Sequence, residues 1–233
     1  MLNCDLMSSL NAQSHDSGRD LLKWLALATM TIDHIGLILY PQILVLRIIG
    51  RLAFPLFCYL LVLGMGSTHD PRRYFYRMLG FAFLSQIPFA IANEIPIWQH
   101  LNIFFTLSLG IILIYFTERN NILVIFPLIA SILIPVDYGV YGLATILFLY
   151  EMRSFKRTGV ALLIVLNLLM IPFGSLYQSF ALLALPIILL HSNGKLKFNL
   201  FRWKTKYPLI TRYFFYAYYP IHLLVLSLIR IIG

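Results

Sequence analysis

Residues 21–39 read LLKWLALATMTIDHIGLIL, an apolar run of helical length with an acid and a histidine side by side near its end. Most side chains of this run would be stable in hydrocarbon, whereas Asp33 and His34 are ionisable and costly to bury. Such a pair needs partners or a function, and within an apolar helix it is by default a hypothesis for a functional site. Other parts of the chain must therefore supply groups that compensate it.

A second apolar run follows after a short break at residues 40–42, and it carries two arginines. Arg47 and Arg51 are four residues apart, so they share one face of a helix. Consecutive antiparallel helices joined by a short turn usually pack together, which brings both arginines beside the first run. The sequence thus predicts that Asp33 pairs with Arg47 or Arg51 and stays ionised.

The composition is that of a polytopic membrane protein. Of 233 residues, 60% are hydrophobic and only 12% charged, against about a quarter charged in ordinary soluble domains. The net charge of +9 is therefore read as a topology signal, and no nucleic-acid partner is expected. The two cysteines, Cys4 and Cys58, suggest neither a disulfide framework nor a metal site.

Hydropathy predicts an all-α protein with about nine transmembrane helices. Residues 1–20 form a polar N-terminal tail without a secretory cleavage site, and residues 21–233 form one transmembrane domain. The expected spans are residues 21–39, 43–66, 74–92, 101–117, 122–136, 138–151, 158–173, 176–191 and 211–231.

The distribution of lysine and arginine supports this count. With the N-terminus in the cytoplasm and the C-terminus outside, the inner segments collect every cation except Arg47, Arg51 and Arg230. The outer loops then contain Glu94 and Asp137 without lysine or arginine. The protein is accordingly predicted to be integral to a membrane, in contact with lipid.

The longest and most basic connection is the expected cytoplasmic loop at residues 192–207, SNGKLKFNLFRWKTKY. One interpretation is an interfacial loop anchored to anionic lipid. The other is a landing site for an anionic cofactor. The cations that would bind it are Lys195, Lys197, Arg202, Lys204 and Lys206.

The polar residues of the first two spans are expected at similar depths in the bilayer. At 1.5 Å per residue, His34 lies about 20 Å from the inner end of its span, in the outer half of the bilayer. Arg47 and Arg51 lie about 6 to 12 Å below the outer surface, so the depths match. The sequence predicts an outward-facing cavity, with Asn102, Tyr138 and Tyr141 at its mouth.

A second group of polar residues lies in the last span, YFFYAYYPIHLLVLSLI. Tyr219-Pro220 is expected to break the helical pattern near mid-membrane, and His222 follows. No partner for His222 is visible in the sequence, so His34 is the preferred candidate for chemistry.

A histidine beside an acid suits general-base catalysis, because neutral imidazole can take a proton from an attacking amine or hydroxyl. Asp33 points about 100° round the helix from His34, so it is expected to organise the arginines. These guanidinium groups suit an oxyanion, a carboxylate or a pyrophosphate. The alternative is a buried ion-pair network that only fixes helix packing.

Six blocks occur in the order found in the TraX family, which the chain resembles over nearly its whole length. They are LKWLALATMTIDHIG (22–36), LRIIGRLAFPLFCYLLVLG (46–64), RYFYRMLGFAFLSQIPFAIA (73–92), LNIFFTLSLG (101–110), DYGVYGLATI (137–146) and YFFYAYYPIHLLVL (213–226). The DHIG, GRLAFPLF and FYAYYPIHL blocks together make the resemblance specific.

The resemblance implies an integral membrane acetyltransferase of the prokaryotic cytoplasmic membrane, similar to wider transmembrane acyltransferases that use acetyl-CoA. The family's eponym is associated with N-acetylation of conjugative pilin. The acceptor is then an amine, such as a pilin-like protein or peptide N-terminus, or a hydroxyl, which a small molecule can also offer. The positions that match the family motif are Asp33, His34, Arg47, Arg51, Asn102, Tyr138, Gly139, Tyr219 and His222.

Two other functions fit the same residues. A small transporter would use Asp33, His34 and the arginines to carry a proton or an anion. A membrane scaffold would use them only for stability. The sequence does not fix the acyl chain, the acceptor or the oligomeric state.

Overall fold

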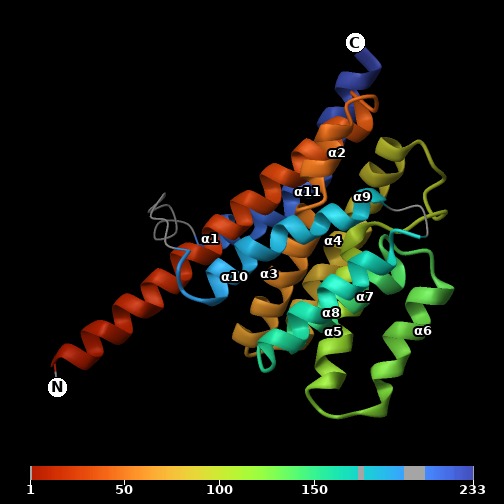
Figure 1. Ribbon diagram of the computed structural model, residues 1–233. Coiled ribbons are helices and arrows are strands. Elements are labelled where there is room, and N and C mark those ends of the chain that lie inside the picture. Colours follow the sequence, from red (N-terminus) through yellow and green to blue (C-terminus); the bar gives the residue numbers. More distant parts are fainter. Residues whose placement is uncertain (1, 173–175, 197–207, 233) are drawn as a thin grey trace.

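The computed structural model describes residues 2–172, 176–196 and 208–232, and its side chains are described for residues 18–172, 177–196 and 213–232. Within these ranges the fold is all-helical, with one isolated bridge between Leu101 and Val136 (Figure 1). The α-helices are α1 (Leu2–Ile38), α2 (Leu44–Gly50), α3 (Ala53–Ser67), α4 (Pro71–Asn93), α5 (Ile103–Thr117), α6 (Ile125–Leu133), α7 (Gly139–Glu151), α8 (Lys156–Leu169), α9 (Leu176–Ser179), α10 (Ala184–Ser192) and α11 (Pro208–Ile232). Two short 3₁₀ helices, η1 (Ile122–Val124) and η2 (Phe180–Leu183), precede α6 and α10.

Each of the nine apolar segments is helical, but the lengths differ. Four described segments are long and apolar enough to cross a membrane: Gly18–Ile38, Leu44–Ser67, Pro71–Asn93 and Tyr213–Ile232. Shorter apolar helices are Ile103–Thr117, Ile122–Leu133, Gly139–Glu151 and Tyr177–Ser192. The ninth segment corresponds to α8 (Lys156–Leu169). The described residues also expose many large apolar side chains. Together with the long apolar helices they identify a membrane protein, in which lipid covers these side chains.

The structure corrects one expectation, the break in the helical pattern at Tyr219-Pro220, and it adds two details to the expected spans. Helix α1 begins at Leu2, so the N-terminal tail is helical and continues into the first apolar run. The second run is divided at Arg51 and Leu52 into α2 and α3. Helix α11 passes through Pro220 without a break, because a proline inside a membrane helix is tolerated when neighbours satisfy the freed backbone.

The core lies where α3, α5 and α7 meet. Leu61 of α3, Ile111 of α5 and Ile146 of α7 have almost no exposed surface. A Cβ added at Gly110 would lie 2.4 Å from the Ile146 side chain, so the absence of a side chain lets α5 and α7 approach. The buried core extends from this centre to residues of α1, α4 and α11, such as Leu22, Met78 and Leu223.

Helices α1, α2 and α11 run together away from that centre. Helix α2 lies along the C-terminal part of α1, and α11 packs between α1 and α4 (Figure 1). Near its C-terminal end, Arg230 pairs with Glu94 at 3.0 Å and donates to the carbonyls of Ile91 and Ala92. The last described helix, α11, therefore packs against the first, α1.

Candidate functional site

The carboxylate of Asp33 binds both arginines of the second apolar run. Arg47 Nη1 lies 2.7 Å from Asp33 Oδ2, and Arg51 Nη2 lies 2.9 Å from Oδ1. Arg47 also donates to the Asp33 carbonyl at 3.2 Å. The side chains of Asp33, Arg47 and Arg51 are 12%, 25% and 14% exposed, so three charges share a largely dry site. The predicted ion pair is thus present with two arginines instead of one.

Two glycines allow α1 and α2 to approach closely enough for these contacts. A Cβ at Gly50 would lie 2.1 Å from Asp33 Oδ1, and a Cβ at Gly36 would lie 2.7 Å from Leu46 Cβ. Neither position has room for a larger residue without displacing its neighbour. The glycine of the GRLAFPLF block is therefore required by the carboxylate that it faces.

A chain of hydrogen bonds extends from Arg51 into the rest of the bundle. Arg51 Nη1 donates to Gln178 Oε1 at 3.3 Å, and Gln178 Nε2 donates to the Tyr141 hydroxyl at 3.0 Å. That hydroxyl donates to Asn167 Oδ1 at 3.0 Å. The cluster on α1 and α2 is thereby connected to α9, α7 and α8, and this connection fixes the second guanidinium.

The imidazole of His34 lies next to this charged cluster and contacts a second imidazole. His34 Nδ1 is 2.9 Å from His222 Nε2, and the ring centroids are 4.9 Å apart. His222 is 6% exposed, and its Nδ1 lies 2.8 Å from the Tyr218 carbonyl oxygen. The structure therefore gives His222 a partner that the sequence did not reveal.

Aromatic residues of α11 enclose the histidine pair. The Tyr218 ring stacks on His222 with centroids 5.1 Å apart, and its hydroxyl lies 2.8 Å from Thr31 Oγ1. Tyr219 is buried, with its ring centroid 6.0 Å from that of His34. Tyr219 thus lies beside His34, and its role as a site residue stays a prediction.

The loop before α7 brings Tyr138 and Asp137 toward Arg51. Tyr138 adopts left-handed backbone angles (φ 61°), which are unusual for an aromatic residue, and its ring stacks on Phe54 at 3.8 Å. The carbonyl of Asp137 accepts from Thr106, and its amide donates to Leu101 at 2.9 Å. Burial raises the pKa of Asp137 to about 6, and the positive charge of Arg51 opposes that rise.

Asn102 does not line an open mouth. Its side chain is fully buried and caps α5 by accepting from the Phe104 amide at 3.0 Å. Its Nδ2 donates to the Ala82 carbonyl at 2.7 Å and to Gln86 at 2.8 Å. The expectation of a cavity-lining residue is corrected here, since these bonds use Asn102 to join α5 to α4.

Only Lys195 of the basic loop can be placed. It is exposed in the turn after α10, and its amide donates to the Leu190 carbonyl at 2.9 Å. Lys197, Arg202, Lys204 and Lys206 lie outside the described residues. Among the residues whose positions are described, there is also no cluster of histidine, cysteine and acidic groups suited to a metal.

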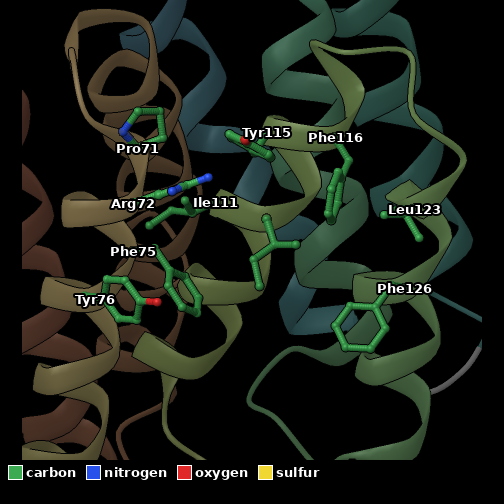
Figure 2. Close-up of a pocket in the computed structure, with 10 residues that line it drawn as sticks. Pro71, Arg72, Phe75, Tyr76, Ile111, Tyr115, Phe116, Leu123 and Phe126 are labelled. Carbon is green, nitrogen blue, oxygen red and sulfur yellow. The ribbon is translucent and has the colours of Figure 1, made fainter.

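A separate groove of about 470 Å³ lies between α4, α5 and the segment from η1 to α6. Figure 2 shows Phe75 and Tyr76 on one wall, Leu123 and Phe126 on the other, and Arg72 between Pro71 and Ile111. It contains none of Asp33, His34, His222, Arg47 and Arg51. The chemistry of the protein is therefore sought at the histidine pair and the arginine cluster.

Sequence reasoning missed the histidine pair and Gln178. The sequence contained a signal for the pair, because His34 and His222 lie at similar distances, about 20 and about 17 Å, from the N-terminal ends of their predicted spans. What the sequence lacked was the knowledge that α1 and α11 are neighbours. Gln178 lies in the short helix α9, and for so short a helix the depth of a residue in the bilayer does not predict its neighbours.

Comparison with known proteins gives one family and two relatives. A family model described as TraX protein matches residues 18–230. The chain is 28% identical over 231 residues to a protein named probable fimbrial assembly protein FimC, serogroup H1, of Dichelobacter nodosus, covering 88% of this chain and 92% of that protein. It is 58% identical over 48 residues to an uncharacterized protein of Rickettsia prowazekii (strain Madrid E), covering 21% of this chain and 19% of that protein, about a fifth of the relative's length. No solved structure matches.

Proposed function

Because the chain belongs to the TraX family, we propose that it is a membrane acyltransferase that transfers an acetyl group from acetyl-CoA to an amine or a hydroxyl. The fimbrial assembly name of the Dichelobacter relative supports a pilin-like protein or peptide N-terminus as the acceptor. The membrane is the cytoplasmic membrane of a prokaryote. The observation that carries the proposal is the contact between His34 of α1 and His222 of α11, beside a carboxylate that holds two arginines.

The topology that suits this function has nine crossings, with the N-terminus in the cytoplasm and the C-terminus outside. Nine helical segments support it, together with the position of lysine and arginine along the sequence. The ion pair between Arg230 and Glu94 also brings the end of α11 beside a loop that this topology places outside. His34 then lies about 20 Å from the inner face.

In the proposed reaction, His34 takes a proton from the amine or hydroxyl as it attacks the thioester carbonyl of acetyl-CoA. The tetrahedral intermediate collapses, the carbon–sulfur bond breaks, and the CoA thiolate takes the proton back from His34. The products are the acetylated acceptor and CoA. No metal is needed, since the protein supplies the base and the cation.

The charge of the arginine cluster suits the oxyanion of that intermediate. Two guanidinium groups share the single carboxylate of Asp33, which leaves one positive charge in a largely dry site. A preorganised charge in such surroundings stabilises a developing negative charge more strongly than it would in water. Arg47 or Arg51 is thus the proposed oxyanion partner, and Asp33 holds both in place.

The donor would enter from the cytoplasm. The basic segment with Lys195, Lys197, Arg202 and Lys204 suits the phosphates of CoA. The pantetheine arm would then extend about 20 Å along α1 to bring the thioester to His34. Tyr219 and Tyr138 would form the walls that exclude water near the reacting carbon.

The test is acetyl transfer by purified protein in liposomes, measured as radiolabel passed from acetyl-CoA to a peptide with a free N-terminal amine, and as release of the CoA thiol. We expect His34→Ala to lower the rate by at least about 100-fold, because a general base contributes about that much or more. His34→Ala should still be stabilised against heat by acetyl-CoA, since a ligand that binds the folded state raises its stability. His69→Ala, in the exposed loop before α4, is the matched control.

Wild-type rates in a folded His34→Ala protein would exclude His34 as the base. Proton or anion flux through liposomes that contain no CoA, abolished by Asp33→Asn, would replace the transferase by a transporter. Loss of thermal stability alone in both variants, with neither transfer nor flux in the wild type, would indicate a scaffold.

A further inference from the structure

The hydrogen bonds of His222 determine where its proton lies. A backbone carbonyl can only accept, so the ring nitrogen that faces the Tyr218 carbonyl, Nδ1, carries hydrogen. In neutral imidazole the other nitrogen is then an acceptor. His222 Nε2 therefore offers a lone pair, and it offers it to His34 at 2.9 Å.

The same reasoning determines which nitrogen of His34 carries hydrogen. Its Nδ1 faces a lone pair, so this nitrogen must carry the hydrogen and donate it to His222 Nε2. The neutral ring of His34 then has its own lone pair on Nε2. That nitrogen is the one available to accept a proton from a substrate.

We propose that His222 is a positioning residue that holds His34 in the tautomer with a basic Nε2. This inference rests on the proposed function in which His34 is the base. The group that orients a catalytic histidine is commonly a carboxylate, but here the neighbouring carboxylate of Asp33 is occupied by two guanidinium groups. A neutral imidazole takes its place and adds no further charge to the apolar interior.

The position of His222 is itself fixed. Its ring lies against the Tyr218 ring at an interplanar angle of 14°, and the Tyr218 hydroxyl is bound to Thr31, one turn before His34 on α1. Near the histidine pair, helix α11 thus contacts α1 through both Tyr218 and His222. This double contact fixes the distance between the two imidazoles and keeps His222 in register with His34.

The arrangement remains favourable when His34 takes up a proton. The imidazolium carries hydrogen on both nitrogens, and its Nδ1–H continues to donate to His222 Nε2. No proton needs to move on to His222. The lone pair of His222 Nε2 therefore stabilises the positive charge that His34 carries during the reaction.

Two substitutions of similar polarity separate this role from packing. Glutamine at position 222 places an amide oxygen near the position of Nε2, whereas asparagine reaches only the position of Nδ1. We expect His222→Gln to keep kcat within about fivefold and His222→Asn to lower it by about 10- to 100-fold, as for other residues that orient a functional histidine. The KM for acetyl-CoA should be unchanged in both, and His191→Asn on α10 is the control for loss of a buried histidine.

A second readout does not depend on transferase activity. Nitrogen-15 NMR of histidine-labelled protein distinguishes the two neutral tautomers, and in the wild type we expect His34 with hydrogen on Nδ1. His222→Asn should shift His34 toward the other tautomer, whereas His222→Gln should not. If His34 keeps the wild-type tautomer and kcat in His222→Asn, the positioning role is wrong. If the tautomer shifts but no acetyl transfer exists, the positioning holds and the proposed function fails.

Discussion

The carboxylate of Asp33 holds two guanidinium groups, and each group has a different second partner. Arg47 also binds the backbone of α1, whereas Arg51 is connected through Gln178 to the far side of the bundle. Among the described residues, the hydrogen bonds of Arg47 go to α1, whereas those of Arg51 connect several helices. A change at Asp33 releases both, and it leaves positive charges in a place that water barely reaches.

Replacing Asp33 tests this coupling. We expect Asp33→Asn to lower the free energy of unfolding by about 3–5 kcal/mol, because removing one partner of a buried ion pair leaves its counterpart uncompensated. Adding Arg47→Gln should restore part of the loss, since it removes one of the two stranded charges. Unfolding of the purified single and double variants in detergent measures both effects. Losses that simply add would show that Asp33 and Arg47 are not coupled.

Helices α1 and α2 pack through glycines, and this contact decides whether the charged groups can meet. Gly50 faces the Asp33 carboxylate so closely that the smallest possible side chain would overlap it. Gly80 of α4 offers a natural comparison, because a Cβ there would meet nothing within 4 Å. The two positions differ in their surroundings and not in the residue that occupies them.

We expect Gly50→Ala to destabilise the protein by about 1–3 kcal/mol, because inserting a methyl group into a packed contact forces its neighbours apart. Gly80→Ala should be neutral or should stabilise by up to about 1 kcal/mol, since alanine is the better helix former. Thermal unfolding midpoints of the two variants make the comparison. Equal effects at both positions would contradict the assigned role of Gly50.

The elements also show how far sequence reasoning reached. Depth and order along the chain were enough to predict that Asp33 meets the arginines, because those helices are consecutive. They were not enough for His222, whose partner lies on a helix from the other end of the sequence. Asn102 was misplaced for a different reason: its short polar side chain was needed as the cap of α5, and this local role was not weighed.

Across the bundle as a whole, the three cations that violate the expected charge distribution all have acidic partners. Arg47 and Arg51 bind Asp33, and Arg230 binds Glu94. Positions of helices followed from hydropathy and from the spacing of lysine and arginine. Their ends did not, since α1 continues to Leu2 and the second run is divided at Arg51 and Leu52.

The unequal lengths of the helices predict a preference for thin bilayers. The segment Ile122–Leu133 measures about 18 Å as a helix, whereas a hydrocarbon core is about 30 Å thick. In the proposed topology this segment crosses the bilayer, so the lipid around it must become thinner or part of the hydrocarbon must face polar groups, at a cost that grows with each ångström of mismatch. We expect a higher unfolding midpoint in myristoyl than in erucoyl phosphatidylcholine. An equal or higher midpoint in the thicker lipid would contradict this expectation.

The two polar clusters differ in when they can form during synthesis. Asp33 and its arginines are separated by 14 and 18 positions, so their charges can neutralise one another soon after α2 leaves the ribosome. The histidines are separated by 188 positions and meet only once α11 has been inserted. A nascent chain can therefore enter the membrane with its charges already paired, while His34 lacks its imidazole partner until α11 has followed.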